Sequence, residues 1–553
     1  MGSTGAATGG RRSFWGWGLE GAGLDPAEQD ALAALVSSGL GVDDVEPVPP
    51  PTVDELDLPG PRVRPPASLR PICTDEPYER AAHTYGKSFR DVLRGLARDF
   101  RRPPDLVALP RDAADVAALL DWCGAEGIAA VPYGGGSSVV GGVEAGACDS
   151  GRGAVSVDLR RLDRVVEVDT SSRAARIEGG VYGPALEDQL RPHGLTMRHF
   201  PQSFEFSTLG GWLATRSGGH YATLHTHIDD FVESMTVVTP RGTVETRRLP
   251  GSGAGPSPDR LFLGSEGILG VITEAWMRVQ DRPRHRASAV ARFATFDAGA
   301  AGARAVVQAG LHPSNCRLLD ATEALITGTS DGSAHLLLLA FESADHPLDP
   351  WIRRAVECAR DHGGTVDDGG IRTSSEPGDA PTEAADDTHR GGAAGAWRKA
   401  FLRAPYMRDA LIGMGLISET FETAITWDRF EGLHAAVTTA VTDALKDAGA
   451  GPGIVTCRFT HVYPDGPAPY FTVIAAGARE PAARLAQWDA VKAAASDTLM
   501  AHGATITHHH AVGRDHRRWY DRQRPDLFAD ALRAAKRELD PAGILNPGVL
   551  IDP

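Results

Sequence analysis

The sequence predicts an α+β protein of two domains, and three observations support this prediction. The chain has 553 residues, more than one hydrophobic core usually organises. Hydrophobic residues make up 42% of it and charged residues 23%, a balance typical of folded globular proteins. Patterns typical of strands and of helices alternate along residues 105–190. We therefore expect sheets with flanking helices, arranged in two domains that share an interface.

The clearest pattern lies in residues 105–138, DLVALPRDAADVAALLDWCGAEGIAAVPYGGGSS. Its first apolar run, Leu106–Leu109, is typical of a strand. Asp112 can cap a helix whose inner face carries apolar residues at helical spacing, namely Val116, Leu119, Leu120 and Cys123. A second apolar run, Ile128–Val131, leads into three consecutive glycines. The segment therefore predicts a strand, a helix and a second strand that ends in a glycine-rich loop.

Other elements are shorter. Strand-like runs begin at Ala154, Val165 and Ala174, and they precede a helix predicted over Pro184–Leu190. Another short helix is predicted over Pro26–Ser37 in a glycine- and proline-rich N-terminal arm, where we expect little chemistry. A last helix should end at Asp540-Pro541, because its apolar stripe stops there; this stripe is Phe528, Leu532, Ala535 and Leu539.

Composition limits the classes of partner. The formal net charge of -16 disfavours nucleic acid and anionic membranes, so an anionic substrate needs a local cluster of arginines. The six cysteines are scattered without a CxxC pair, as is typical of a reducing cytoplasm. Neither a signal peptide nor a membrane-spanning apolar run is evident. We predict a cytoplasmic protein with no nucleic-acid partner and no transmembrane segment, and peripheral contact with lipid is left open.

Three glycine-rich stretches indicate that the backbone closely approaches a ligand. In PYGGGSS, Pro132–Ser138, the glycines lack the Cβ atoms that would hold N–H groups away from a phosphate. In PQSFEFSTLGGWLATRSGG, residues 201–219, small and hydroxyl residues alternate with glycine pairs. In GSEGILGVITEA, residues 264–275, glycines recur every third position. No Walker loop and no GxGxxG before a helix is present in PYGGGSS, but the three stretches in this order are far more specific than any one.

These stretches resemble the PCMH-type FAD-binding domain of flavoproteins of the vanillyl-alcohol-oxidase type, and the chain resembles the alkyldihydroxyacetonephosphate synthase (alkylglycerone-phosphate synthase) family. The resemblance extends to RRSFWGWG near Arg11, CRLLD at Cys316, MRDALIGMGLISETFETAITWDRF at Met407, CRFTHVYPDGPAPYFT at Cys457, THHHAVGRDHRRWY at Thr507 and the terminal DPAGILNPGVL. It implies a homodimeric two-domain flavoprotein with FAD at the domain interface. It also implies an α+β cap domain with a ferredoxin-like sheet and flanking helices.

The resemblance divides the chain into four parts: an N-terminal arm and helical segment (1–100), a FAD-binding domain (101–282), a substrate or cap domain (283–500), and a C-terminal segment that completes the active site (501–553). Within the cap domain, residues 367–395 are polar, glycine-rich and aperiodic. This pattern predicts a flexible surface insertion.

The resemblance also implies which residues hold FAD. The cofactor should be noncovalent, because PYGGGSS has no histidine or cysteine to tether it. The pyrophosphate should lie on Pro132, Tyr133, Gly134, Gly135, Gly136, Ser137 and Ser138. Further contacts should come from two later stretches: Gln202, Ser203, Phe204, Glu205, Phe206, Ser207, Thr208, Thr215, Arg216, Ser217 and Gly218, and Glu266, Gly267, Ile268, Leu269, Gly270, Val271 and Ile272.

The family reaction exchanges the acyl group of acyl-dihydroxyacetone phosphate for a fatty alcohol. It forms an ether lipid without net redox change, through a bond between flavin N5 and the carbon beside the ketone. By resemblance, Tyr470 is a catalytic acid/base whose ordinary pKa of about 10 must be lowered by its neighbours. Arg408 binds substrate and Arg317 is a second arginine important for activity; a guanidinium suits a phosphate dianion. An apolar channel should admit the alkyl chain.

The adjacent His508, His509 and His510 match a triple histidine of the family. If they form a strand, alternate side chains point to opposite faces, and no third metal ligand is in view. We therefore predict no metal site. At least one histidine should face flavin and substrate, and it should donate to an oxygen or relay a proton to Tyr470. Three other histidines are interpreted as loop residues rather than metal ligands: His220, His225 and His227.

Two other functions stay open on the residues. One is a FAD-linked oxidase or dehydrogenase that takes hydride from a 2-hydroxy acid or an alcohol. The other is a noncatalytic flavin-binding protein. Tyr470, Arg408 and the triple histidine suit a phosphorylated ketone better than generic hydride transfer. Departures from the family pattern, such as Tyr133 before the glycines, leave the substrate open.

Overall fold

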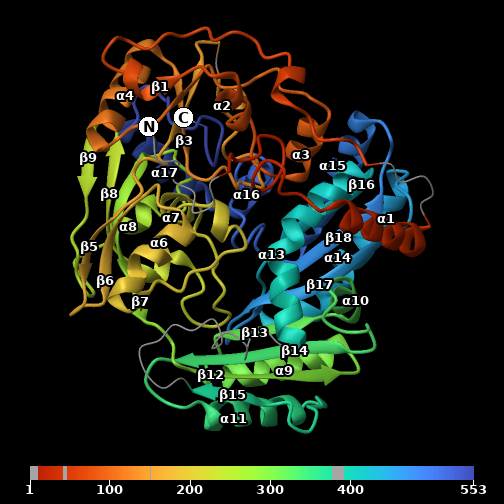
Figure 1. Cartoon of the computed structure of the whole chain (residues 1–553). Coiled ribbons are helices and arrows are strands. Elements are labelled where there is room, and N and C mark those ends of the chain that lie inside the picture. The colour runs from red at the N-terminus through yellow and green to blue at the C-terminus, as the bar shows by residue number, and fades with distance from the viewer. Residues whose placement is uncertain (1–9, 42–46, 150, 376–391, 553) are drawn as a thin grey trace.

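The computed structural model describes residues 10–41, 47–149, 151–375 and 392–552. Figure 1 shows a first body of sheets and helices built from the first half of the chain, and a second body built around a larger sheet. The C-terminal helices α16 (Arg517–Gln523) and α17 (Asp526–Leu539) return to the first body. The architecture is α+β with two domains, which confirms the predicted fold class.

The first body contains two larger sheets and a two-stranded one formed by β7 (Leu195–Thr196) and β11 (Gln280–Asp281). The order of the four-stranded sheet is β1 (Cys73–Thr74), β2 (Leu106–Ala108), β4 (Ala154–Asp158) and β3 (Ala129–Tyr133), with β2, β4 and β3 parallel. The five-stranded antiparallel sheet runs β5 (Val165–Asp169), β6 (Ala174–Glu178), β10 (Val271–Arg278), β8 (Val232–Thr239) and β9 (Gly242–Glu245). Helices α6 (Gly183–Leu190) and α7 (Leu209–Thr215) lie beside the second sheet.

Helix α4 (Ala113–Glu126) forms as its sequence predicts. The Asp112 carboxylate accepts a hydrogen bond from the Asp115 N–H at 2.8 Å and so caps the first turn. The four apolar residues of the predicted inner face are all buried: Val116, Leu119, Leu120 and Cys123. The helix is amphipathic because its period of 3.6 residues places them on one side, against β2 and β4.

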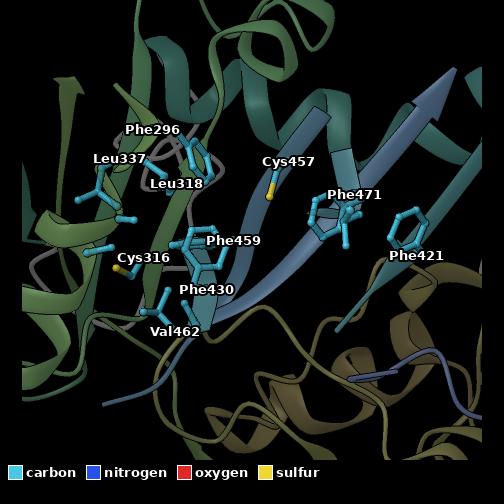
Figure 2. Close-up of a cluster of buried hydrophobic side chains, with 14 of the residues drawn as sticks. Phe296, Cys316, Leu318, Leu337, Phe421, Phe430, Cys457, Phe459, Val462 and Phe471 are labelled. Atoms are coloured by element: carbon cyan, nitrogen blue, oxygen red, sulfur yellow. The ribbon is translucent and has the colours of Figure 1, made fainter. Parts of the chain in front are cut away.

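The second body is a seven-stranded antiparallel sheet in the order β15 (Arg372–Ser375), β12 (His285–Phe293), β14 (His335–Ser343), β13 (Asn315–Leu319), β17 (Gly453–Val462), β18 (Pro467–Ala476) and β16 (Leu416–Glu422). One face packs on α9 (Phe296–Gln308), α11 (Asp349–Arg360), α14 (Trp427–Asp447) and α15 (Pro481–Ala501). Figure 2 shows aromatic side chains of this core, among them Phe430, Phe459 and Phe471.

The opposite face of this sheet carries polar residues. Along β17, Cys457 and Phe459 point into the helix-covered core, whereas Arg458 and Thr460 line a cavity. A register shift between Phe459 and His461 lets His461 join the cavity face as well. The two-residue period of a strand therefore separates a hydrophobic core from a polar site, and the irregularity adds one histidine to that site.

Three predictions need correction. Within the predicted insertion 367–395, Arg372–Ser375 form edge strand β15 because they pair with β12, and α13 (Gly392–Gly413) already begins at Gly392; residues 376–391 lie outside the described part. Phe528 of the predicted apolar stripe is 53% exposed. Helix α17 instead turns Lys536 inward, because its ammonium donates to the carbonyl oxygens of Ile268 and Leu545 and to the Asp540 carboxylate.

The N-terminal arm is the third correction. Its helix α1 (Pro26–Leu40) is three residues longer than predicted, and the side chain of Trp17 reaches the cavity between the two bodies. The arm is therefore part of the site rather than a remote extension. Among the described residues, no helix is both long enough and apolar enough to cross a membrane.

Candidate active site

One cavity lies between the glycine-rich loops of the first body and the polar face of the seven-stranded sheet. PYGGGSS lines one side from Pro132 to Ser138, and β13, β17 and β18 line the other through Arg317, Arg458 and Tyr470. The C-terminal segment closes it with His509, His510 and Ala511. Residues from three distant parts of the chain thus meet in one cavity.

The loop Gly134–Gly136 leaves no space for side chains. A Cβ atom at Gly135 would collide with the Phe206 carbonyl oxygen, and one at Gly134 would collide with the Thr208 hydroxyl. Gly136 has φ +66°, a left-handed conformation that favours glycine. The loop can therefore present bare backbone to a ligand, which is what a pyrophosphate requires, so the residues present fit FAD.

Most of the predicted cofactor residues line this cavity, but six do not. Ile268 and Leu269 are instead buried in the hydrophobic core of the first body. The Arg216 guanidinium pairs with Asp229 at 2.8 Å instead. Phe204 packs against the ring of Trp212 and Phe206 against that of Trp17, and Glu205 between them is exposed.

Two guanidiniums lie on the sheet face of the cavity. Arg317 is 5% exposed, and burial together with the nearby Arg458 lowers its pKa to about 10. It therefore stays charged at neutral pH. Arg458 forms a buried ion pair with Glu323 and places its guanidinium carbon 3.9 Å from the centre of the Tyr470 ring. Sequence reasoning missed Arg458, although its alternation with Cys457 and Phe459 was a usable signal.

Arg408 reaches the same cavity from helix α13. Its guanidinium lies 3.2 Å from Asp409, and the other carboxylate oxygen of Asp409 accepts a hydrogen bond from the Trp17 N–H. The N-terminal arm thus holds the acid that pairs with Arg408. The structure brings Arg408 together with Arg317 and Arg458 around one cavity.

Tyr470 is 4% exposed and stands between two strands, opposite Glu422 of β16 and Arg458 of β17. Burial raises the pKa of its phenol, and this effect outweighs Arg458, which lowers it. The expectation that neighbours lower this pKa is therefore wrong, because desolvation of the phenolate dominates. Tyr470 is a protonated phenol at neutral pH.

The triple histidine is a loop, not a strand, and a buried carboxylate organises it. Glu422 accepts hydrogen bonds from the backbone N–H groups of His508, His509 and His510, at 2.6, 2.9 and 2.8 Å. Burial alone would raise the pKa of Glu422, but the adjacent imidazoles outweigh burial and hold this pKa well below its usual value. Three successive backbone groups share one acceptor, so the strand alternation we expected does not apply.

The three imidazoles have different surroundings. His509 and His510 line the cavity, and their rings lie beside Tyr470, with centroids 6.4 and 5.5 Å from its own. His508 points away; its Nε2 lies 2.7 Å from the Tyr463 hydroxyl and its Nδ1 lies 2.9 Å from His509 Nδ1. Burial lowers the pKa of His510 to about 3, so His510 is neutral at physiological pH.

Glu266 joins this loop to the first body. Its carboxylate accepts hydrogen bonds from the N–H groups of Val512 and Gly513 at 2.9 and 2.8 Å, just after the triple histidine. Burial raises its pKa to about 7, against these hydrogen bonds. Glu266 also lines the cavity, and its contact with the cofactor stays a prediction. It therefore links the glycine-rich stretch to the histidine loop.

The loop histidines of the first body are not equivalent. His225 is exposed. His227 Nε2 lies 3.3 Å from His508 Nε2, which links this loop to the triple histidine. Both ring nitrogens of His220 are shielded from solvent and have no hydrogen-bond partner among the described residues. Burial and then Arg198 lower the pKa of His220 to about 3.

Two family models cover most of the chain: "FAD binding domain" over residues 104–247 and "FAD linked oxidases, C-terminal domain" over residues 282–550. With the cavity described above, they define a flavoprotein enzyme, and FAD is its cofactor.

Relatives identify the particular family. An alkyldihydroxyacetonephosphate synthase of Dictyostelium discoideum is 30% identical over 493 residues, which covers 86% of this chain and 78% of that protein. One from Trypanosoma brucei brucei is 29% identical over 500 residues, covering 86% and 77%. A solved alkyldihydroxyacetonephosphate synthase structure aligns with a TM-score of 0.78 at 25% identity over 97% of this chain and 98% of its own. The chain belongs to the alkyldihydroxyacetonephosphate synthase family, which confirms the resemblance.

We predict that Gly135→Ala weakens FAD binding. The added methyl group would collide with the Phe206 carbonyl oxygen, and overpacking of this kind costs about 1–3 kcal/mol, equivalent to roughly 5- to 150-fold weaker binding. Flavin absorbance per chain during FAD titration measures the effect. Gly253→Ala is the matched control, because a Cβ atom there meets open space. Equal FAD affinity in both variants would contradict a close approach at Gly135.

We predict that His220 makes the protein acid-sensitive. An unfolded histidine binds a proton at a pKa of about 6.5, whereas folded His220 does so only near pH 3. Its stabilising contribution is therefore complete above about pH 6.5 and is lost as pH falls, by up to about 1.4 kcal/mol per pH unit.

Denaturant unfolding of wild type and His220→Phe at about pH 7 and about pH 5 tests this point. The variant should lose less stability on acidification. His225→Gln, at an exposed position of the same loop, should behave like wild type. An unchanged pH dependence in His220→Phe would rule out this role.

Proposed function

We propose that the enzyme exchanges the acyl group of acyl-dihydroxyacetone phosphate for a fatty alcohol, without net redox change, and so forms an ether lipid. One observation carries this proposal: three guanidiniums, a phenol and three imidazoles converge on a single cavity against the glycine-rich loop. This set offers cations for a phosphate together with groups that can donate and accept protons. The two similar proteins are named alkyldihydroxyacetonephosphate synthases, which supports an alkylated product of dihydroxyacetone phosphate.

The substrate phosphate is assigned to the cluster of Arg317, Arg408 and Arg458. Arg317 and Arg458 are buried cations on neighbouring strands, and Glu323 is the carboxylate paired with Arg458. An arriving dianion would reduce the repulsion between these cations. Guanidinium groups also bind phosphate through two parallel hydrogen bonds, which fixes orientation as well as charge.

The alkyl chain is assigned to the part of the cavity beside helix α13. Phe401, Met407 and Leu411 line it from the helix, and Ile474 lines it from β18. These apolar residues adjoin Arg408, so a lipid with a phosphate head could place the head on the arginines and the chain along the helix. Burial of each methylene contributes about 0.8 kcal/mol.

Proton movements are assigned to Tyr470 and His509. Because Tyr470 is a neutral phenol, it suits a hydrogen-bond or proton donor to an oxygen of the substrate. His509 Nδ1 lies 3.3 Å from the buried Glu422 carboxylate, which orients the imidazole and stabilises the cation formed when Nε2 takes a proton. FAD, when bound, would supply an electrophilic ring system for the carbon that loses this proton.

We also propose an assembly and a location. The protein is a cytoplasmic homodimer that binds FAD noncovalently, and its substrates are lipid-like phosphorylated ketones and fatty alcohols, as in the family. Peripheral contact with lipid would give the enzyme access to such substrates.

A second candidate is a FAD-linked oxidase of a 2-hydroxy acid or an alcohol. The match of residues 282–550 to the C-terminal domain of FAD linked oxidases favours it. A 2-hydroxy acid is also an anion that the arginine cluster could bind. It would, however, leave the apolar residues along α13 without a ligand.

We predict transfer of label from a radiolabelled fatty alcohol into an alkyl product when acyl-dihydroxyacetone phosphate is supplied. Release of one fatty acid should accompany each product, and flavin absorbance should be unchanged after turnover because no net redox change occurs. Mass balance and anaerobic spectra measure both. Lasting bleaching of the flavin by a 2-hydroxy acid, without any alkyl product, would instead establish the second candidate.

We predict that Tyr470→Phe lowers kcat on the order of 100-fold or more, because general acid–base groups typically contribute that much. FAD content and the thermal midpoint should stay near wild type, since the ring still packs under Arg458. Tyr78→Phe serves as a control, because Tyr78 lies outside the cavity lining. Wild-type turnover by Tyr470→Phe would exclude a role of its hydroxyl.

A further inference from the structure

The described residues bring three histidines from two distant segments together. One ring nitrogen from each of His461, His508 and His509 lies within 4.8 Å of the others. His461 belongs to β17, where the register shift turns it to the cavity side. The expectation of no third ligand assumed that the triple histidine was an isolated strand. The folded chain supplies this ligand from a neighbouring element.

Glu422 adds an oxygen to the cluster. Its Oε2 lies 3.3 Å from His509 Nδ1 and 3.9 Å from His508 Nδ1, and the two Nδ1 atoms are 2.9 Å apart. Tetrahedral Zn²⁺ with ligands at about 2.0–2.1 Å separates its ligand atoms by roughly 3.3 Å. The separations among Glu422, His508 and His509 lie near that value, whereas the nitrogen of His461 is known only to lie within 4.8 Å of those of the other two histidines. Binding of one ion by all four residues therefore requires side-chain movement.

We propose that His461, His508, His509 and Glu422 form a binding site for a divalent transition-metal ion of the zinc class. Imidazole nitrogens with one carboxylate oxygen are ligands that such ions prefer over Mg²⁺ or Ca²⁺. The proton that lies between the two Nδ1 atoms moves to Nε2 of the ring that carries it, so both Nδ1 lone pairs can bind the ion and each imidazole stays neutral. No proton is lost and no group is oxidised or reduced.

The surroundings hold the ligands in place. His508 Nε2 lies 2.7 Å from the Tyr463 hydroxyl, and His461 Nε2 lies 3.0 Å from the Gly219 carbonyl oxygen. Outer hydrogen bonds of this kind orient metal-binding imidazoles. His461 and His509 line the main cavity, so an ion can enter by the path that substrate uses.

Occupancy of this site inhibits the enzyme. This consequence rests on the proposed function, in which His509 accepts a proton and Glu422 stabilises it. A metal ion takes the lone pair of His509 and the oxygen of Glu422 at once. Metal binding itself does not depend on that function, and it can be measured without substrate.

The test uses the FAD-loaded chain without a polyhistidine tag. Co²⁺ should produce the ligand-field bands of a tetrahedral site, and Zn²⁺ should displace it with one ion per chain. Calorimetry should show that His461→Gln and His508→Gln each weaken Zn²⁺ binding by at least about tenfold. Loss of a hydrogen-bond partner of a metal ligand already costs about that much, and loss of a ligand should cost no less. His225→Gln, on an exposed loop, should bind Zn²⁺ like the wild type.

Absence of tetrahedral Co²⁺ bands in the wild type would overturn the site. So would equal Zn²⁺ affinity in wild type, His461→Gln and His508→Gln, provided flavin content shows that the variants are folded. If binding holds, alkyl exchange should be inhibited by Zn²⁺ and restored by a chelator, to the same extent in wild type and His225→Gln. Binding without inhibition would retain the site and reject its effect on catalysis.

Discussion

The cavity depends on one constraint, the alternation of side chains across strands β13, β17 and β18. Phe459 and Phe471 enter the helix-covered core, and each buried phenyl contributes about 1.5–3 kcal/mol. Their neighbours Arg458 and Tyr470 must then face the cavity. A shift of one residue would exchange the two faces and bury a guanidinium among phenyl rings. Hydrophobic packing on one side of the sheet therefore fixes the position of the polar groups on the other.

A second constraint acts on the C-terminal loop. Successive backbone N–H groups at 508–510 lie outside any sheet or helix, so each needs an acceptor. Glu422 satisfies all three with one buried carboxylate. Because Glu422 ends β16 and pairs with Tyr470 in the register of the sheet, the loop is held at a fixed distance from the phenol. Both constraints therefore act on the pair of strands β16 and β18.

Local signals made the first body predictable from sequence. The cap of α4 and its apolar spacing are encoded within fifteen residues. The consecutive glycines of PYGGGSS are enough to predict that other atoms approach this backbone closely. Contacts between distant segments were not predictable in this way. Glu422 and His461 resemble ordinary strand residues until β16 and β17 meet the histidine loop, and the register shift that turns His461 has no sequence pattern of its own. The strand predicted at the triple histidine is wrong, because the backbone N–H groups of all three residues donate to the single Glu422 carboxylate.

Electrostatics explains why this cavity should attract an anion although the chain is acidic overall. The net charge of -16 repels anions at long range, but salt screens that field beyond about 8–10 Å. Inside the cavity, Arg317 and Arg458 are both buried, and burial, followed by the charge of Arg458, lowers the pKa of Arg317. A dianion between them replaces repulsion by two charge-assisted contacts. The same burial keeps Tyr470 protonated, so the site pairs cations with a neutral donor, and a bound anion would strengthen that state further.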